Sequence, residues 1–199
     1  MIPEGFRLYP GKLGAAAQAA LAREVLTAAE AAPFYQPMTR GGPMSVAMTN
    51  LGPLGWITDA RGYRYEPRHP ETGRPWPAIP PALLDLWDEL ADAATPPDAC
   101  LVNLYRDGAR MGLHQDRDEA DFAYPVLSVS LGDSALFRIG GRSRKDPTRQ
   151  IRLTSGDVVV LAGAARLAHH GVDRVIPGSS RLIPGGGRIN LTLRRAVSP

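Results

Sequence analysis

The chain has 199 residues, of which 44% are hydrophobic and 22% charged, proportions that are ordinary for a globular protein with a sizeable core. Its formal net charge of +3 and its pI of about 9.3 permit an anionic partner such as nucleic acid without requiring one. A single cysteine, Cys100, excludes an internal disulfide, and neither a signal peptide nor an apolar run of the roughly 20 residues that span a bilayer is found. We therefore expect a cytoplasmic protein without a membrane partner.

The first part of the chain predicts a helix. Residues 11–32 are rich in alanine, contain no helix breaker from Ala15 to Ala32, and are followed by Pro33. We expect residues 1–35 to form an N-terminal helical segment that packs against the core.

Residues 36–79 are rich in proline and glycine. Short strand-like pieces lie between the turns, which favours a hairpin-rich flap rather than part of a core sheet. The flap carries Trp56, Tyr63 and Tyr65. These aromatic side chains either anchor the flap to the core or form a stacking surface for a planar ligand such as a base.

The remaining 120 residues, 80–199, predict a helix followed by a β core. The helix covers residues 81–94, begins at Pro81, and carries apolar side chains at helical spacing that place Trp87 in the core. Short strands separated by turn residues follow, which is typical of a sandwich or barrel. The predicted strands cover residues 99–105, 127–131, 136–139, 151–153, 158–161 and 189–193.

The tripeptide His114-Gln115-Asp116 is the first pattern that carries chemistry. Side chains alternate along a strand, so His114 and Asp116 point to the same side and can bind one metal ion. His170 is the best candidate for a third ligand. Two histidines and one carboxylate on one face of an iron form the facial triad of non-haem Fe(II) oxygenases. The alternative is an exposed histidine in an acidic turn.

The other histidines differ in their expected roles. His169 and His170 are neighbours and point in opposite directions on a strand, so only one of them is expected to be a ligand. Gly171 allows another backbone to approach closely, which favours His170. His69, which lies among prolines, is expected at the surface.

Residues 188–194 place polar side chains on one face of a strand and apolar side chains on the other. Arg188 and Arg194 lie roughly 20 Å apart at about 3.3 Å per residue, and both can lean toward a shared small dianion. Asn103 and Tyr105 share one face of another strand and can hydrogen-bond the same ligand. The alternative is a solvated strand face with surface arginines.

In combination, these segments resemble the AlkB family of Fe(II)/2-oxoglutarate-dependent dioxygenases from about residue 34 to the end. The resemblance rests on residues 44–50 (MSVAMTN), 54–56 (LGW), 62–63 (GY), 75–77 (PWP), 103–108 (NLYRDG), 113–119 (LHQDRDE), 129–132 (VSLG), 156–160 (GDVVV), 166–167 with 170–171, and 188–194 (RINLTLR).

The resemblance implies an α+β, mainly β fold with a double-stranded β-helix (jelly roll) core, covered by a nucleotide-recognition lid formed by residues 36–79. It implies Fe(II) as the metal and 2-oxoglutarate and O2 as co-substrates. By the same match, His114, Asp116 and His170 bind Fe(II), Asn103, Tyr105, Arg188, Asn190 and Arg194 bind 2-oxoglutarate, and Trp56, Tyr63, Asp118 and Arg144 lie at the substrate.

The activity that the resemblance implies is oxidative demethylation of N-alkylated bases such as N1-methyladenine and N3-methylcytosine, in single- or double-stranded DNA or in RNA. Hydroxylation of the alkyl carbon would release formaldehyde, succinate and CO2. A monomer is expected, because one lid and one core complete the site. His169 and Ile189 stand where the family carries aromatic residues, and we expect these departures to affect packing or oxygen access rather than the type of reaction.

Three alternatives follow from the same residues. The first is a dioxygenase of this fold that acts on RNA, a protein side chain or a small molecule, against which the aromatic lid favours a base. The second is a non-catalytic binding module, which gives no reason for an intact set of metal-binding and arginine residues. The third is a zinc hydrolase, in which Arg188 and Arg194 would have no role.

Overall fold

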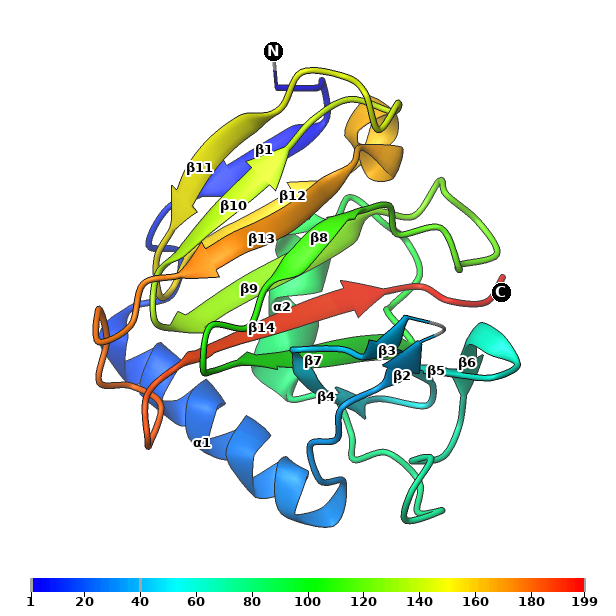
Figure 1. Cartoon of the computed structure of the whole chain (residues 1–199), viewed down its shortest axis with the longest axis vertical. Coiled ribbons are helices and arrows are strands. Elements are labelled where there is room, and N and C mark those ends of the chain that lie inside the picture. Colours follow the sequence, from blue (N-terminus) through cyan, green and yellow to red (C-terminus); the bar gives the residue numbers. More distant parts are fainter. Residues whose placement is uncertain (1, 40, 199) are drawn as a thin grey trace.

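The computed structural model describes residues 2–39 and 41–198, and two antiparallel sheets face each other in it (Figure 1). The larger sheet has the order β1-β12-β9-β14-β7-β4, and the smaller sheet has the order β11-β10-β13-β8. The strands of the larger sheet are β1 (Phe6–Tyr9), β12 (Val158–Leu161), β9 (Val126–Gly132), β14 (Arg188–Arg194), β7 (Ala99–Tyr105) and β4 (Ala47–Leu51). Those of the smaller sheet are β11 (Arg149–Leu153), β10 (Ala135–Ile139), β13 (His170–Val175) and β8 (Met111–His114). The predicted mainly β jelly roll is confirmed.

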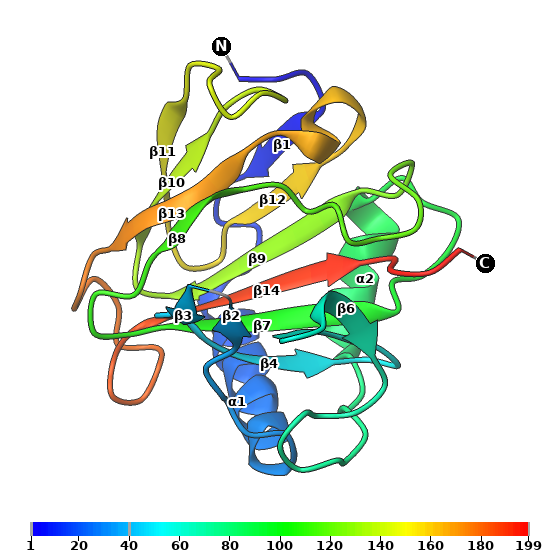
Figure 2. The ribbon, with the colours of Figure 1, turned by 45° about the vertical axis from the view of Figure 1, so that its right-hand side comes forward.

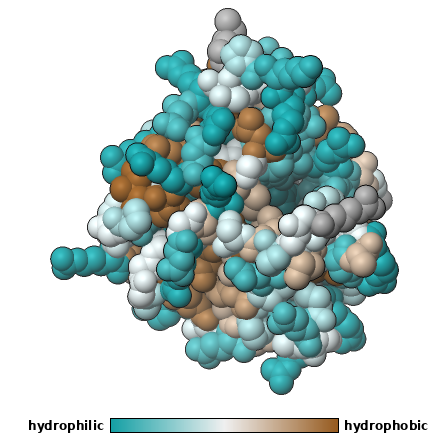
Figure 3. Space-filling view, viewed as in Figure 1, coloured by the Kyte–Doolittle hydropathy of each residue, from teal (hydrophilic) through white to brown (hydrophobic). Residues whose placement is uncertain are grey.

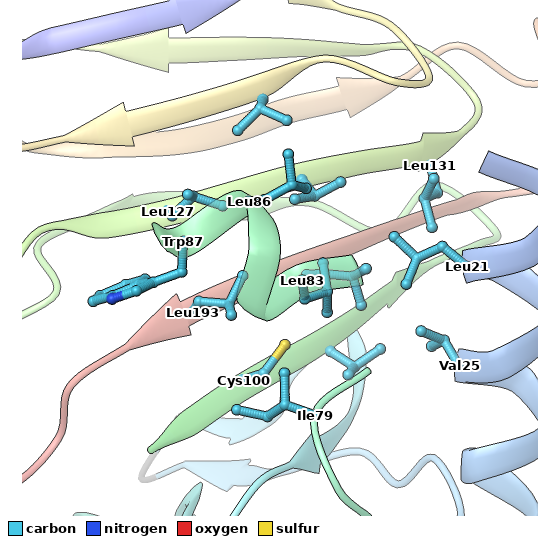
Figure 4. Close-up of a cluster of buried hydrophobic side chains, with 14 of the residues drawn as sticks. Leu21, Val25, Ile79, Leu83, Leu86, Trp87, Cys100, Leu127, Leu131 and Leu193 are labelled. Atoms are coloured by element: carbon cyan, nitrogen blue, oxygen red, sulfur yellow. The ribbon is translucent and has the colours of Figure 1, made fainter. Parts of the chain in front are cut away.

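Two helices cover the outer face of the larger sheet. They are α1 (Ala15–Ala31) and α2 (Pro81–Leu90), and both end earlier than the sequence predicted. Figure 4 shows Leu21 of α1 and Leu83 and Trp87 of α2 pointing toward side chains of β7, β9 and β14, including Cys100 and Leu193. Trp87 is fully buried, as its position in the helical repeat predicted.

The strand β14 separates two environments. Ile189, Leu191 and Leu193 are fully buried in the core beneath the helices. The polar side chains between them face the smaller sheet, where Arg188 and Arg194 line a cavity. The predicted division of this strand into an apolar and a polar face is therefore confirmed, and the polar face lies inside the jelly roll.

Two short hairpins lie beside the β4 edge of the larger sheet (Figure 2). One consists of β2 (Met38–Thr39) and β3 (Gly42–Pro43), and the other of β5 (Gly55–Asp59) and β6 (Gly62–Glu66). A short 3-10 helix, η1 (Gly163–Leu167), connects β12 to β13.

Several predictions for the first third of the chain are wrong or incomplete. Residues 36–79 do not form only a flap, because β4 pairs along its whole length with β7 and completes the core sheet. His69 is not a surface residue: it is buried, its Nε2 donates to the carbonyl of Pro33 (2.8 Å), and its ring packs between Tyr35 and Trp76. The strand β1, which pairs with β12, was not predicted in the N-terminal segment.

Neither helix among the described residues is long and apolar enough to cross a membrane. On the face shown in Figure 3, hydrophilic side chains surround smaller, separate hydrophobic patches.

Leu83→Ala should destabilise the fold by about 2–5 kcal/mol, because Leu83 is fully buried and its truncation leaves a cavity between α2 and the sheet. Urea unfolding measures the change. Leu84→Ala is the matched control, because this neighbouring leucine is only partly buried. Equal losses in the two variants would contradict the packing described here.

Candidate functional site

Three side chains that can bind a metal ion meet where β8 pairs with β13. His114 lies directly opposite His170 in the register of the two strands. One ligand atom from each histidine and one from Asp116 all lie within 4.8 Å of one another. Asp116 follows the end of β8 in an irregular segment, and not within the strand as the alternation argument assumed, yet its carboxylate still reaches the histidines.

Gly171 makes this close pairing possible. A Cβ atom at this position would lie 2.5 Å from the carbonyl oxygen of Met111 and 2.8 Å from that of Gly112. A side chain would therefore push β8 away from β13 and separate His114 from His170. The close backbone approach predicted from the sequence at Gly171 is confirmed.

Each imidazole is oriented by its own backbone. The Nδ1–H of His114 donates to the carbonyl of Gly112 (2.9 Å), and the Nδ1–H of His170 donates to that of Ala168 (2.9 Å). Both Nε2 atoms therefore carry a free lone pair, and they lie 3.8 Å and 3.7 Å from the two carboxylate oxygens of Asp116. Such backbone hydrogen bonds fix the tautomer and ring orientation of metal-binding histidines.

The carboxylate of Asp116 is held at one oxygen only. Arg194 donates from Nη2 to Oδ1 (2.8 Å), whereas Oδ2 is buried and has no hydrogen-bond partner among the described residues. A buried carboxylate oxygen without a partner is costly unless a cation completes it. The site therefore fits a metal, and a donor set of two imidazoles and one carboxylate suits Fe(II).

Burial and neighbouring charges keep Asp116 and His170 in the protonation states that bind a metal. Burial disfavours the charged form of Asp116, but Arg194 and the two histidines outweigh it, and the pKa of Asp116 lies below its ordinary value. Burial, together with His114, lowers the pKa of His170 to about 4. Near neutral pH the site therefore offers a carboxylate and a neutral imidazole without prior loss of protons.

An inner cavity of about 70 Å³ lies behind the three side chains, between the two sheets. Arg188, which is 1% exposed, lines it and donates from Nη2 to Ser130 Oγ (2.9 Å). Its Nε and Nη1 find no partner in the described part of the chain, and burial lowers its pKa to about 10. A buried guanidinium with unused donors is stabilised by a bound anion, and a carboxylate can accept hydrogen bonds from two of its coplanar N–H groups at once.

The other residues predicted for the dianion line the same cavity, but they are not equivalent. Tyr105 is buried beside Arg188, and the side-chain oxygen of Asn103 lacks a hydrogen-bond partner within the described ranges. Asn190 donates to Ser128 Oγ (2.7 Å) and is already satisfied. The structure thus brings the five residues together. Among the described residues Arg188 leaves two buried donors, Nε and Nη1, without a partner, whereas Arg194 donates from Nη2 to Asp116 and leaves its buried Nε without one.

An outer cavity of about 610 Å³ lies on the other side of the three side chains, and Trp56, Tyr63, Asp118 and Arg144 all line it. The rings of Trp56 and Tyr63 are stacked, with centroids 5.4 Å apart and planes inclined by 18°. The indole Nε1 of Trp56 donates to Asp118 Oδ2 (2.8 Å), and Arg144 Nη1 donates to the carbonyl of Leu113 (2.8 Å). His169 also lines this cavity.

The two cavities meet at the candidate metal site. His114 and Asp116 line both of them, and so does Arg194. A small anion held by Arg188 and a planar molecule held by the aromatic pair would therefore approach the same metal from opposite sides.

A buried charge cluster beside the site was missed by the sequence analysis. Glu119 accepts from Arg166 Nη2 (2.8 Å) and from the hydroxyl of Tyr65 (2.5 Å), and Arg166 also donates to the backbone carbonyl of Asp116 (2.6 Å). The sequence placed Glu119 in an acidic turn and gave no signal that Arg166, 47 positions later, neutralises it.

A sequence profile of the 2OG-Fe(II) oxygenase superfamily matches residues 5–194. Together with the jelly roll and the cluster of His114, Asp116 and His170, this match defines a 2-oxoglutarate-dependent, non-haem Fe(II) dioxygenase. The zinc hydrolase and the non-catalytic binding module are thereby set aside.

Curated relatives narrow the assignment. The chain is 72% identical over 193 residues to an alpha-ketoglutarate-dependent dioxygenase AlkB homolog of Caulobacter vibrioides, covering 96% of this chain and 88% of that protein. It is 46% identical over 181 residues to the alpha-ketoglutarate-dependent dioxygenase AlkB of Escherichia coli, covering 88% and 83%. The chain belongs to the AlkB family of Fe(II)/2-oxoglutarate-dependent dioxygenases.

Two more distant matches agree with this family assignment. A protein named DNA N(6)-methyladenine demethylase ALKBH1A from Arabidopsis thaliana is 37% identical over 157 residues, covering 73% of this chain and 46% of that protein. The solved structure of OsALKBH1 superposes with a TM-score of 0.78 at 32% identity, covering 96% of this chain and 97% of that one.

The metal-free protein should lose stability as the pH falls from about 6.5 to about 4. The ordinary pKa of His170 is 6.5 and the folded value is about 4, so in this window the unfolded chain binds a proton that the folded chain does not. The full contribution, of the order of 3 kcal/mol, is present above pH 6.5. Asp116, with its lowered pKa, acts in the same direction below about pH 4.

Urea unfolding of the chelator-treated protein across this range tests the effect, with His170→Asn as the comparison because it removes the titrating group. An equally steep dependence on pH in both proteins would show that His170 is not its source.

Proposed function

We propose that this enzyme is an oxidative demethylase that repairs N-alkylated bases, such as N1-methyladenine and N3-methylcytosine, in DNA or RNA. The observation that carries the proposal is the meeting of two different cavities at His114 and Asp116. One is lined by the buried Arg188, two of whose donors have no partner among the described residues, and the other by stacked aromatic rings. The Arabidopsis relative, which is named a DNA demethylase, supports a nucleic acid as the substrate.

In this proposal His114, Asp116 and His170 hold Fe(II), and 2-oxoglutarate occupies the inner cavity. Bound iron, with O2 and 2-oxoglutarate, supplies the oxidation that hydroxylates the alkyl carbon, with release of succinate, CO2 and finally formaldehyde. The free donors of Arg188 pair with the carboxylate of the co-substrate that lies farther from the metal. Further contacts to the co-substrate would come from Asn103 and Tyr105. Asn190 and Arg194, which also have partners within the chain, line the same cavity beside it.

The outer cavity suits a cationic base. N1-methyladenine and N3-methylcytosine carry positive charge near neutral pH, and an aromatic face such as that of Trp56 attracts a cation by about 0.5–2 kcal/mol. Asp118 adds a negative charge at the same cavity, and Arg144 lies at its rim to meet the nucleic acid backbone. Alkylation also blocks base pairing, which lowers the cost of flipping the lesion out of a duplex.

We further propose that the chain works as a monomer in the cytoplasm. Residues 1–35 would form a supporting segment, the two hairpins within residues 36–79 the nucleotide-recognition lid, and residues 80–199 together with β4 the catalytic core. Both cavities are lined by residues of one chain, which supports a site that needs no second subunit.

The first experiment loads the protein anaerobically with Fe(II) and 2-oxoglutarate, adds a single-stranded DNA oligonucleotide with one N1-methyladenine, and then admits air. Mass spectrometry should show loss of the methyl group with the wild type and none with His114→Ala, which removes one metal ligand. Succinate formation without loss of the methyl group would refute the base-repair assignment and leave the dioxygenase. The same oligonucleotide made as RNA compares the two nucleic acids.

Arg188→Lys should raise the KM for 2-oxoglutarate at least about tenfold, because an ammonium group cannot form the paired hydrogen bonds of a guanidinium. Steady-state succinate formation measures it. Arg138→Lys is the matched control, because Arg138 lies on β10 and pairs with Asp173 (2.9 Å) away from the inner cavity. Equal KM values in the two variants would contradict the role given to Arg188.

A further inference from the structure

The β5–β6 hairpin is hydrogen-bonded to two adjacent carboxylates, Asp118 and Glu119, in the segment that follows the candidate metal ligand Asp116. Trp56 and Tyr65 are directly opposite each other in the hairpin, so their side chains lie on one face. Trp56 Nε1 donates to Asp118 Oδ2 (2.8 Å), and the hydroxyl of Tyr65 donates to Glu119 Oε1 (2.5 Å). Both carboxylates follow Asp116 within three residues.

The two contacts differ in their surroundings. Asp118 is exposed and lines the outer cavity, so its partner can change when a ligand enters. Glu119 is only 6% exposed, and its other oxygen accepts from Arg166 (2.8 Å). Burial raises the pKa of Tyr65 well above its ordinary value, so its hydroxyl keeps the proton that it donates to Glu119.

Glu119 is connected to the candidate metal ligand Asp116 through the guanidinium group of Arg194. Arg194 Nε lies 3.4 Å from Glu119 Oε1, and Arg194 Nη2 donates to Asp116 Oδ1 at 2.8 Å. Arg194 therefore lies between two carboxylates that compete for it. The hydroxyl of Tyr65 satisfies the same Oε1 atom of Glu119 that faces Arg194, and so weakens the attraction of Glu119 for the guanidinium.

We propose that Tyr65 is a positioning residue for the metal site. By hydrogen-bonding Glu119, it lets Arg194 stay on Oδ1 of Asp116, so that only Oδ2 is left for the metal. Without the hydroxyl, Arg194 moves toward Glu119 and releases Oδ1. Asp116 could then bind the metal through both oxygens. Its second oxygen would occupy a coordination position that 2-oxoglutarate or O2 needs. The inference rests on the metal and co-substrate roles proposed above.

The two hydrogen bonds of the hairpin, from Trp56 to Asp118 and from Tyr65 to Glu119, would also have different roles when a substrate binds. A cationic base that binds Asp118 would replace the hydrogen bond from Trp56, while the hydrogen bond from Tyr65 to Glu119 would still hold the hairpin in place. Placement of the hairpin over the outer cavity and orientation of Asp116 thus depend on the same hydroxyl group.

Tyr65→Phe tests the proposal, because it removes only the hydroxyl, and Tyr9→Phe is the matched control on β1. Both variants and the wild type are loaded anaerobically with Co(II) and 2-oxoglutarate, because the d–d absorption of Co(II) depends on its coordination number and geometry. We expect an altered spectrum for Tyr65→Phe alone. In the Fe(II) demethylation assay its kcat should fall about tenfold, while the KM for the oligonucleotide changes less than twofold.

An unchanged Co(II) spectrum in Tyr65→Phe, in a protein whose thermal unfolding shows it to be folded, would overturn the proposal. A double variant gives a second test: if Tyr65 acts through Glu119, adding Tyr65→Phe to Glu119→Gln has no further effect on the spectrum, whereas additive effects would refute the connection. A wild type that forms succinate but leaves the methyl group in place would refute the proposed substrate, and the Co(II) comparison would still decide the role of Tyr65.

Discussion

The ion pair between Arg194 and Asp116 is the interaction on which the site depends. Both side chains are buried, and isolated charges in such a place would be costly. They persist because a second pair, Arg166 with Glu119, lies next to them, and the four charges sum to zero. The pair fixes one oxygen of Asp116 and leaves the other without a hydrogen-bond partner among the residues that the structure describes, which is the arrangement that a single-oxygen metal ligand requires. Loss of either arginine would leave a buried carboxylate uncompensated.

The strand β14 directs Arg194, and with it Arg188, into the interior of the jelly roll. Its apolar side chains are covered by the two helices, so its polar side chains must face the smaller sheet. Arg188 and Arg194 therefore lie inside the jelly roll at opposite ends of one strand. Their identical chemistry is used differently: Arg194 is neutralised by protein carboxylates, whereas Arg188 keeps donors for an anion from solution.

The candidate metal site lies where a small cavity between the sheets meets a larger cavity. A non-haem iron dioxygenase must bring a small dianion, oxygen and a bulky substrate to one metal without mixing them with bulk water. Entry from two cavities meets that requirement, because the inner cavity is lined mainly by strands of the two sheets, and the outer one by residues of the hairpins beside β4 together with the segment that follows β8. In the proposed function the co-substrate would lie in the cavity lined mainly by paired strands, and the alkylated base in the cavity that the hairpins help to form.

Local sequence patterns determined much of this protein. The alternation in residues 188–194, the helical spacing around Trp87 and the glycine after His170 each predicted a feature that the structure confirms, because periodicity states which face of an element is buried. The identity of the ligating residue types also lies in the sequence. Only the tertiary structure decided which distant segments meet. The strand β1 was not predicted because four residues gain a strand partner only from β12. The burial of Glu119 and the difference between Arg188 and Arg194 likewise depend on charges brought from elsewhere in the chain, and no local pattern records a partner that lies dozens of residues away.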